Sequence, residues 1–310
     1  MNVIEVDNLT KDYGSGRGVF NVGISVGEGE VFGFLGPNGA GKSTTIRHLM
    51  GFSKPDGGST FIFGKPTFSR YYEILGKVGY IPGEIALPAG LTGREFIGMM
   101  QSMHGGGSSE HLKKMLDLFE LSDEQLCGDT KRMSLGVKRK LAVVTAFMHD
   151  PEVLILDEPT SGLDPVMQDV FVNYIREEKK RGKTVLLSSH IFSEVDSTCD
   201  KIAIIKDGKI VNRFVADDLK HASKKFYTVV FRSEEYALAF AGRITALPTA
   251  ELLKCDEKTL SLSLDDCDLN EMIALLSDSG VESFSNRSES LEDYFMKFYK
   301  EDRDFGGALQ

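Results

Sequence analysis

Cysteine is scarce in this chain of 310 residues, which has only Cys127, Cys199, Cys255 and Cys267. None of them belongs to a Cys-x-x-Cys pair, and no group of cysteines has the spacing of metal ligands. The sequence therefore gives no sign of a disulfide framework or a structural metal centre. We expect the four thiols to be free, as in a reducing compartment.

Long apolar runs and an excess of basic residues are also missing. No stretch approaches the ~18–20 apolar residues that span a bilayer. Residues 1–7 alternate like a β-strand and lack the basic start of a signal peptide. The chain has 36 Lys and Arg against 46 Asp and Glu, a formal net charge of −10, which argues against a general nucleic-acid binder. We expect a cytoplasmic protein that reaches a membrane only through a partner.

One glycine-rich segment matches a motif whose chemistry is known. Residues 36–43 read Gly-Pro-Asn-Gly-Ala-Gly-Lys-Ser, the P-loop pattern, with an apolar run before it and a helical pattern after it. Such a loop turns backbone amides and a helix N-terminus toward phosphate oxygens. Lys42 is expected to reach the β- and γ-phosphates, and Ser43 to ligate Mg²⁺. The predicted nucleotide contacts are Gly36, Pro37, Asn38, Gly39, Ala40, Gly41, Lys42, Ser43 and Thr44.

A second segment adds two carboxylates. Residues 153–156 form a continuous apolar run, typical of a parallel strand buried on both faces, and Asp157 and Glu158 follow it. Ligands bind at the carboxyl ends of such strands. Asp157 is expected to hold Mg²⁺, directly or through a water, and Glu158 to polarise the water that attacks the γ-phosphate. Two carboxylates in a solvated turn are the alternative, which the neighbouring P-loop makes less favourable.

The order and spacing of these motifs resemble the ATP-binding subunit of an ABC transporter. The segments that carry the resemblance are the P-loop, residues 156–159, residues 161–164 and His190 after an apolar strand. They lie within residues 1–215, and the remainder is similar to the C-terminal extension of exporter ATPases whose permease is a separate chain. The resemblance implies ATP hydrolysis with Mg²⁺, a head-to-tail homodimer that closes on two ATP molecules, and a peripheral position at the cytoplasmic face of the cell membrane. It does not identify the transported substrate.

Further site residues follow from the resemblance. It implies that Tyr13 stacks on adenine, although an ordinary tyrosine at the end of a strand is the alternative. It implies that His190 contacts the γ-phosphate and holds the attacking water. Ser134 and Gly136 would bind the ATP of the partner subunit, and Asp164 would couple the two sites.

Two motifs depart from the family pattern. The signature Leu-Ser-Gly-Gly-Gln appears as Met-Ser-Leu-Gly-Val at residues 133–137, and a purely structural N-cap is the less favoured alternative for Ser134. The glutamine that the family places near Mg²⁺ is Gly83 here, followed by Glu84. Glu84 is the candidate substitute ligand, with a water molecule as the alternative, and we expect hydrolysis that is slower or more dependent on the permease.

The remaining pattern predicts the fold. Helices and strands alternate over residues 134–206, which predicts a parallel sheet with helices on both faces, and Asp207-Gly208 predicts a hairpin after it. We expect an α/β P-loop ATPase core of the ABC type over residues 1–215, with a helical subdomain at about 84–133. Residues 216–302 are expected to form a small ferredoxin-like α+β domain, and 303–310 a tail.

One structural question and two functional alternatives remain open. The apolar residues 85–96 either line a groove for a permease helix or simply pack on the core. A soluble kinase or GTPase is disfavoured by residues 134–136 and His190. A soluble non-transport ABC ATPase acting on ribosomes or nucleic acid is the second alternative, disfavoured by the acidic charge and the lack of zinc-binding cysteines.

Overall fold

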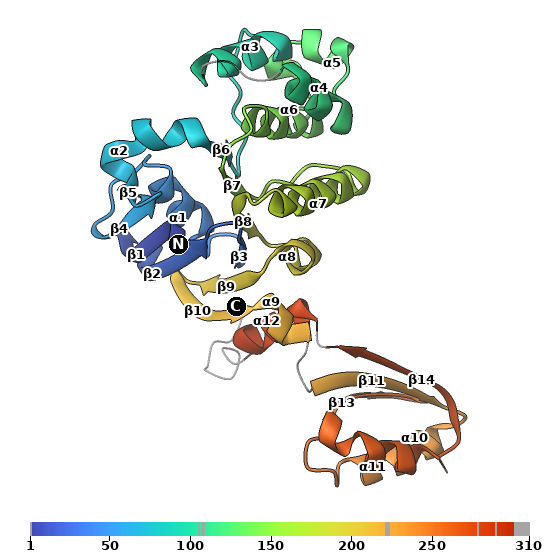
Figure 1. Ribbon diagram of the computed structural model, residues 1–310. Helices are drawn as coiled ribbons and strands as arrows, with labels where there is room; N and C mark the ends of the chain where they lie inside the picture. Colours follow the sequence, from blue (N-terminus) through green and yellow to red (C-terminus); the bar gives the residue numbers. More distant parts are fainter. Residues whose placement is uncertain are drawn as a thin grey trace. The chain divides into compact units, whose positions relative to one another are not determined.

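The computed structural model describes residues 2–104, 106, 109–220, 224–277, 279–288 and 290–300. The chain divides into two compact units, Met1–Val215 and Ala216–Gln310 (Figure 1). Residues 303–310, expected to form a tail, lie outside the described residues.

The first unit is built on a six-stranded sheet with the strand order β10-β9-β3-β8-β7-β6. Its strands are β3 (Val31–Leu35), β6 (Val78–Ile81), β7 (Val153–Asp157), β8 (Thr184–Ser189), β9 (Lys201–Lys206) and β10 (Lys209–Val215). All neighbouring pairs are parallel except β9–β10. Strands β3, β7 and β8 are buried along their whole length, which explains the apolar runs at residues 31–35, 153–156 and 185–187. The predicted hairpin is confirmed, with Asp207 and Gly208 both at positive φ.

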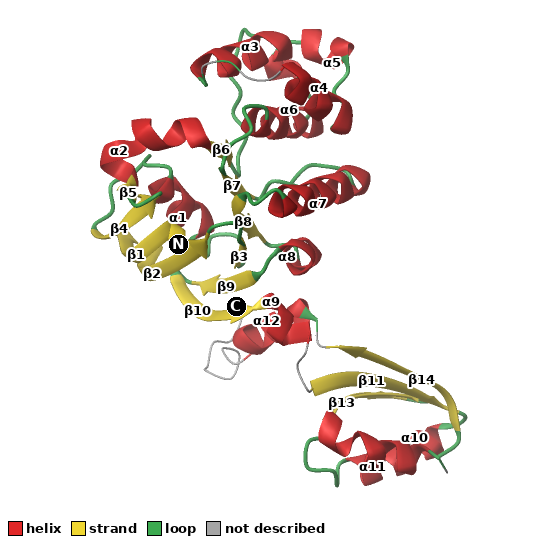
Figure 2. Cartoon of the chain, in the orientation of Figure 1, coloured by secondary structure: helices red, strands yellow, loops and turns green. Residues whose placement is uncertain are grey.

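Helices and a second sheet cover the two faces of the six-stranded sheet. Helix α1 (Lys42–Leu49) and the antiparallel sheet lie on one side, and α7 (Pro165–Lys180) and α8 (Phe192–Thr198) on the other (Figures 1 and 2). The antiparallel sheet has the order β2-β1-β4-β5. Its strands are β1 (Asn2–Asp12), β2 (Gly18–Gly27), β4 (Gly57–Ile62) and β5 (Lys65–Pro66). One apolar cluster, with Ile4, Phe34 and Ile155 among its members, joins the two sheets and therefore fixes the P-loop between them.

Short helices fill the chain between β4 and β7. They are α2 (Thr67–Ile74), α3 (Gly93–Met103), α4 (Ser109–Leu118), α5 (Asp123–Cys127) and α6 (Leu135–Phe147). A capping box formed by Thr92 and Glu95 starts α3. No pattern in the sequence predicted α2. Its helical φ/ψ pattern is interrupted at Arg70.

The second unit contains a four-stranded sheet with the order β12-β13-β11-β14, in which every pair is antiparallel. Its elements are α9 (Ala216–Lys220), β11 (Lys224–Phe231), α10 (Glu234–Ile244), β12 (Glu251–Asp256), β13 (Thr259–Asp265), α11 (Leu269–Leu276), β14 (Val281–Ser288) and α12 (Leu291–Lys300). Side chains of β11 and β13 pack with α10 and α11 in a separate core. The elements from β11 to β14 follow the expected β-α-β-β-α-β order, and the ferredoxin-like classification stays a prediction.

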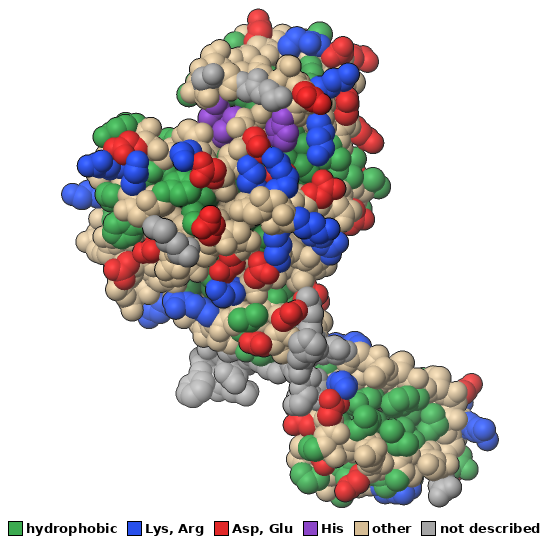
Figure 3. Space-filling model, in the orientation of Figure 1, with side chains coloured by type: hydrophobic (Ala, Val, Ile, Leu, Met, Phe, Trp, Pro, Cys, Tyr) green, Lys and Arg blue, Asp and Glu red, His purple; other side chains and the backbone are tan. Residues whose placement is uncertain are grey.

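The thiols and the charges agree with the composition. All four cysteines are free, and only Cys199 is buried, which raises the pKa of its thiol to about 12. On the face shown in Figure 3, acidic and basic side chains are interspersed.

A stacked pair of histidines links the residue after α3 to the residues after α6. The rings of His104 and His149 lie 3.7 Å apart at an angle of 11°. Burial, with His104 beside it, lowers the pKa of His149 to about 4. The ring is therefore neutral in the fold at pH values where an unfolded histidine already takes up a proton.

This pair makes stability depend on pH. The unfolded chain binds the proton of His149 first, so stability that is fully present above about pH 6.5 is lost as the pH falls toward 4, by on the order of 3 kcal/mol. A His149→Phe variant keeps an aromatic ring but cannot take up a proton. We expect its melting temperature to fall less than that of the wild type between pH 7 and pH 5. Equal falls in the two proteins would contradict the assignment.

Candidate active site

The P-loop follows β3 and leads directly into α1. Gly39 and Gly41 have φ values of 82° and 111°, in the left-handed region that favours glycine. A Cβ atom at Gly41 would lie 2.7 Å from Cγ1 of Val19, so the loop also needs glycine for lack of space. The loop surrounds a hollow of about 130 Å³. The hollow is lined by Pro37, Asn38, Gly39, Gly41, Lys42, Ser43, Thr44 and Glu158.

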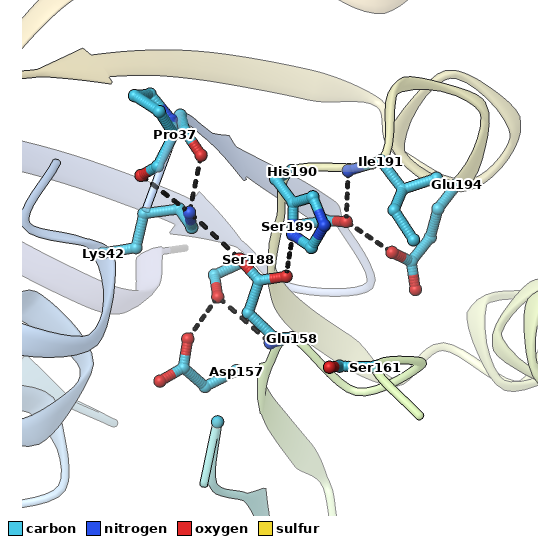
Figure 4. Close-up of polar contacts among 12 residues, drawn as sticks. Pro37, Lys42, Asp157, Glu158, Ser161, Ser188, Ser189, His190, Ile191 and Glu194 are labelled. Carbon is cyan, nitrogen blue, oxygen red and sulfur yellow. Dashed lines mark hydrogen bonds and ion pairs between the residues drawn. The ribbon is translucent and has the colours of Figure 1, made fainter. Parts of the chain in front are cut away.

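The ammonium group of Lys42 is held at the edge of this hollow. The side chain is only 5% exposed. Its Nζ donates to the carbonyl oxygens of Gly36 at 2.5 Å and Pro37 at 3.1 Å, and forms an ion pair with Oε1 of Glu158 at 3.0 Å (Figure 4). These contacts place the positive charge beside the end of β7.

Asp157 and Glu158 are fixed by Ser188 on the neighbouring strand β8. The Ser188 hydroxyl donates to Oδ1 of the buried Asp157 at 2.5 Å. The amide of Glu158 donates to the Ser188 carbonyl oxygen at 3.1 Å. Glu158 has a φ of 49°, a conformation that costs free energy for a residue with a side chain. This backbone is therefore held in place by its surroundings, and the carboxylate points at Lys42 (Figure 4).

His190 meets the same carboxylate from the end of β8. Its Nδ1 contacts Oε2 of Glu158, while the side chain is 47% exposed. Lys42, Glu158 and His190 thus converge from the ends of β3, β7 and β8, with β8 between the other two strands in the sheet. The carboxyl ends of adjacent parallel strands meet at one edge, and that edge is where such sheets bind ligands.

Several of the predicted site residues do not line this hollow, among them Tyr13, Glu84, Ser134 and Gly136. Tyr13, 55% exposed, and the exposed Glu84 do not line it. Ser134 is the N-cap of α6 and accepts the amide hydrogen of Val137 at 3.3 Å, and the half-buried Gly136 lies in the same turn. The roles proposed for these residues therefore need a ligand or a second chain that extends beyond the hollow.

Two further predicted residues have structural contacts. Ala40 is buried, and its carbonyl oxygen accepts the amide hydrogen of Gly208 at 3.0 Å. Asp164 is the N-cap of α7 and accepts the amide hydrogen of Met167 at 3.0 Å. These contacts give each residue a place in the fold, independent of any role toward a nucleotide.

Arg139 is a residue that the sequence analysis missed. It lies in α6, 2% exposed, and its guanidinium donates to the carbonyl oxygens of Ser161, Pro82 and Gly83 at 2.8, 2.9 and 2.8 Å. Burial lowers the pKa of Arg139, against the effect of the neighbouring carboxylates. One side chain thus ties α6 to the loops that follow β6 and β7. The available signal was its spacing of three and four residues from Ala142 and Val143, which puts Arg139 on the same face of the helix as these apolar residues.

A larger hollow of about 430 Å³ is a less suitable candidate for an active site. Its lining includes Arg181 and Lys183, whose charges are already paired with Asp150. It also includes residues at the starts of β1 and β8, away from the P-loop end of the sheet. The hollow beside the P-loop is therefore the candidate active site.

Comparison with known proteins agrees with this geometry. Residues 19–161 match the family model of ABC transporters. The bacitracin transport ATP-binding protein BcrA of Bacillus licheniformis is 33% identical over 300 residues, which cover 95% of this chain and 96% of that protein. The chain belongs to the family of ABC transporter ATP-binding proteins. The resemblance stated from the motifs and the predicted core fold are thereby confirmed, and the protein is an ATP-hydrolysing transporter subunit.

Other similarities are consistent with membership of this ABC family. The Nod factor export ATP-binding protein I of Burkholderia orbicola is 36% identical over 72% of this chain and 73% of its own length. A solved ATP-binding subunit of an ABC transporter has a TM-score of 0.63 at 30% identity, over 71% of this chain and 92% of that one. Residues 129–196 also match a model described as an AAA domain, putative AbiEii toxin, Type IV TA system. Among the described residues, no helix has both the length and the apolar character needed to cross a bilayer.

The Arg139 contacts give a testable prediction. An Arg139→Lys variant keeps the charge but has a single ammonium for three carbonyl oxygens. We expect it to lose roughly 2–3 kcal/mol of unfolding free energy, because buried acceptors are left without donors. Denaturant unfolding measures the change, with Lys138→Arg, on the same helix and bonded to the Lys131 carbonyl, as the control. Equal stability of the two variants would show that the three contacts contribute little.

Proposed function

We propose that this ABC ATPase powers an exporter whose permease is a separate chain. The support is the similarity, over nearly the whole chain, to a bacitracin transport ATP-binding protein and, over most of it, to a Nod factor export protein. The single observation that carries the hydrolytic mechanism is the position of Glu158 between Lys42 and His190. The transported substrate is a property of the permease, so no substrate is proposed.

In the proposed reaction, Lys42 and the P-loop amides bind the β- and γ-phosphates. His190 donates a hydrogen bond to the γ-phosphate, and Glu158 orients and polarises the attacking water. The ion pair of 3.0 Å between Lys42 and Glu158 supports this assignment, because it places a carboxylate and a phosphate-binding cation at one point. Preorganised charge of this kind is the main way in which proteins accelerate phosphoryl transfer.

The residues beside the hollow fit Mg²⁺. Ser43 contributes a hydroxyl oxygen and Asp157 a carboxylate oxygen, the hard ligands that this ion prefers. Asp157 Oδ1 is engaged by Ser188, and Oδ2 faces Gly83, where a Cβ atom would lie 3.0 Å away. A side chain at residue 83 would therefore crowd Asp157. When bound, the ion would neutralise phosphate charge. Glu84 is retained only as a possible outer ligand.

We further propose that two copies of the chain close head to tail on two ATP molecules. Ser134 and Gly136 lie at the N-terminus of α6, where amides and the helix dipole favour an anion. They do not line the hollow of their own chain, so the γ-phosphate they would bind belongs to the second copy. Tyr13 would stack on adenine, and Asp164 would lie near the interface. Hydrolysis would remove the phosphate contacts and open the dimer.

We propose that the permease docks on exposed apolar side chains of residues that come before and after residues 85–96 in the sequence. In α2, Tyr71 and Tyr72 are 50% and 68% exposed, and in α3 Met103 is 73% exposed. Large apolar side chains at a surface favour a protein contact. This contact would hold the subunit at the cytoplasmic face of the membrane.

The order of closure and hydrolysis is tested with Glu158→Gln. This variant keeps the P-loop and loses the base, so we expect phosphate release to fall by roughly 10²–10⁴-fold while ATP is retained. Light scattering coupled to gel filtration should then detect a dimer that forms only with ATP. Lys42→Ala, which removes the phosphate-binding ammonium, is the control that should stay monomeric. A Glu158→Gln protein that neither traps ATP nor dimerises would rule out the proposed order.

The partner is tested by purification of the full chain from mildly solubilised native membranes. We expect a stoichiometric protein with several membrane spans to co-purify, and a Tyr72→Ser variant to recover less of it. Val211→Ser, at an exposed position on β10, is the matched control. Recovery of ribosomes or nucleic acid instead would favour the soluble ABC alternative.

A further inference from the structure

The turn that carries His190 is built from two linked hydrogen bonds. Ser189 is the last residue of β8, and Ile191 precedes α8. The Ser189 hydroxyl accepts the amide hydrogen of Ile191 at 2.9 Å and donates its own hydrogen to Oε2 of Glu194 at 2.5 Å (Figure 4). His190 lies between Ser189 and Ile191, so, in this relay, the hydrogen bond that joins these two residues spans its backbone.

The relay replaces an ordinary helix cap. In a capping box, a glutamate at the third helical position accepts the amide hydrogen of the N-cap residue directly. Glu194 has that position in α8 and Ile191 is the N-cap, but the hydroxyl of Ser189 is inserted between them. The carboxylate of Glu194 therefore acts on the residue before His190 as well as on the start of the helix.

Burial of the Glu194 carboxyl group is unfavourable for folding. It is 4% exposed, and burial raises the pKa of its carboxyl to about 7, against the effect of the hydroxyls of Ser189 and Thr160. A buried carboxyl group costs folding free energy unless its hydrogen bonds offset the lost hydration. The bond to Ser189 links this group to the turn that bears His190, and a hydrogen bond with Thr160 links it to the loop after β7.

Packing alone does not hold the turn. The side chain of His190 is nearly half exposed. A hollow of about 270 Å³ has Ile191, Ser193 and Glu194 in its lining. Because the turn borders open space, the hydrogen bonds of Ser189 contribute to holding its backbone.

We propose that Glu194 is a positioning residue for hydrolysis, which acts through Ser189 to place His190 against Glu158. The proposal rests on the role given to His190 above. Neither Glu194 nor Ser189 lines the hollow beside the P-loop. Loss of the relay should therefore lower kcat and leave ATP binding unchanged, because a displaced catalytic group slows the chemical step without removing the phosphate contacts.

The test compares Glu194→Ala, Ser189→Ala and the double variant in the full-length chain. We expect each single variant to lower kcat about tenfold, with the Kd for ATP within about twofold of the wild type. The double variant should lose no more than either single variant, because both remove the same relay. Glu194→Gln retains an acceptor oxygen of the same reach and should keep at least about half of the wild-type kcat.

Ser197→Ala is the matched control, since the Ser197 hydroxyl donates to the backbone oxygen of Glu194 at 3.1 Å and takes no part in the relay. The proposal is overturned if Glu194→Ala has the kcat of Ser197→Ala, if the losses multiply in the double variant, or if Glu194→Gln is as slow as Glu194→Ala. The His190→Ala variant distinguishes failure of the proposed role of His190 from failure of the relay. Full activity of that variant removes the proposed role of His190, whereas its inactivity beside an active Glu194→Ala removes only the relay.

Discussion

The carboxylate of Glu158 is the contact on which the rest of the site depends. It forms an ion pair with Lys42 and contacts Nδ1 of His190, and the backbone of Glu158 has a positive φ. That conformation persists because Ser188 on the adjacent strand bonds both the amide of Glu158 and the carboxylate of Asp157. The geometry needed for hydrolysis is therefore set by the register between β7 and β8, which the apolar core beneath them fixes.

Two neighbouring serines at the end of β8 have different hydrogen-bond partners. Side chains alternate between the two faces of a sheet, so the Ser188 hydroxyl bonds the Asp157 side chain on one face and the Ser189 hydroxyl bonds Glu194 of α8 on the other. One serine orders the carboxylates, and the other orders the turn that bears the histidine. A strand of six buried residues thus connects two parts of the site that are supplied by different elements.

Local patterns predicted the residues that form the candidate active site, and they did so for a physical reason. The P-loop, Asp157, Glu158 and His190 are each defined by residues adjacent in sequence and by a strand end, which a sequence displays directly. Arg139, Ser188, Ser189 and Glu194 act through partners on other elements, so their importance appears only when the strand order is known. The pairing of β1 with β4 and the interrupted helix α2 were likewise not predictable, because no local period marks them. The signature residues and Tyr13 lie outside the hollow of one chain, and their roles stay predictions.

The uneven distribution of the free thiols makes motion in this protein measurable. Cys127 is exposed at the end of α5, and Cys255 and Cys267 are exposed in the second unit, whereas Cys199 is sealed in the core with its proton retained. Thiol reagents attack only accessible thiolates. A maleimide dye or a nitroxide would thus label both units of the natural sequence and spare the sheet. Distances between the labels could then be followed through a cycle of nucleotide binding and release without introducing any new cysteine.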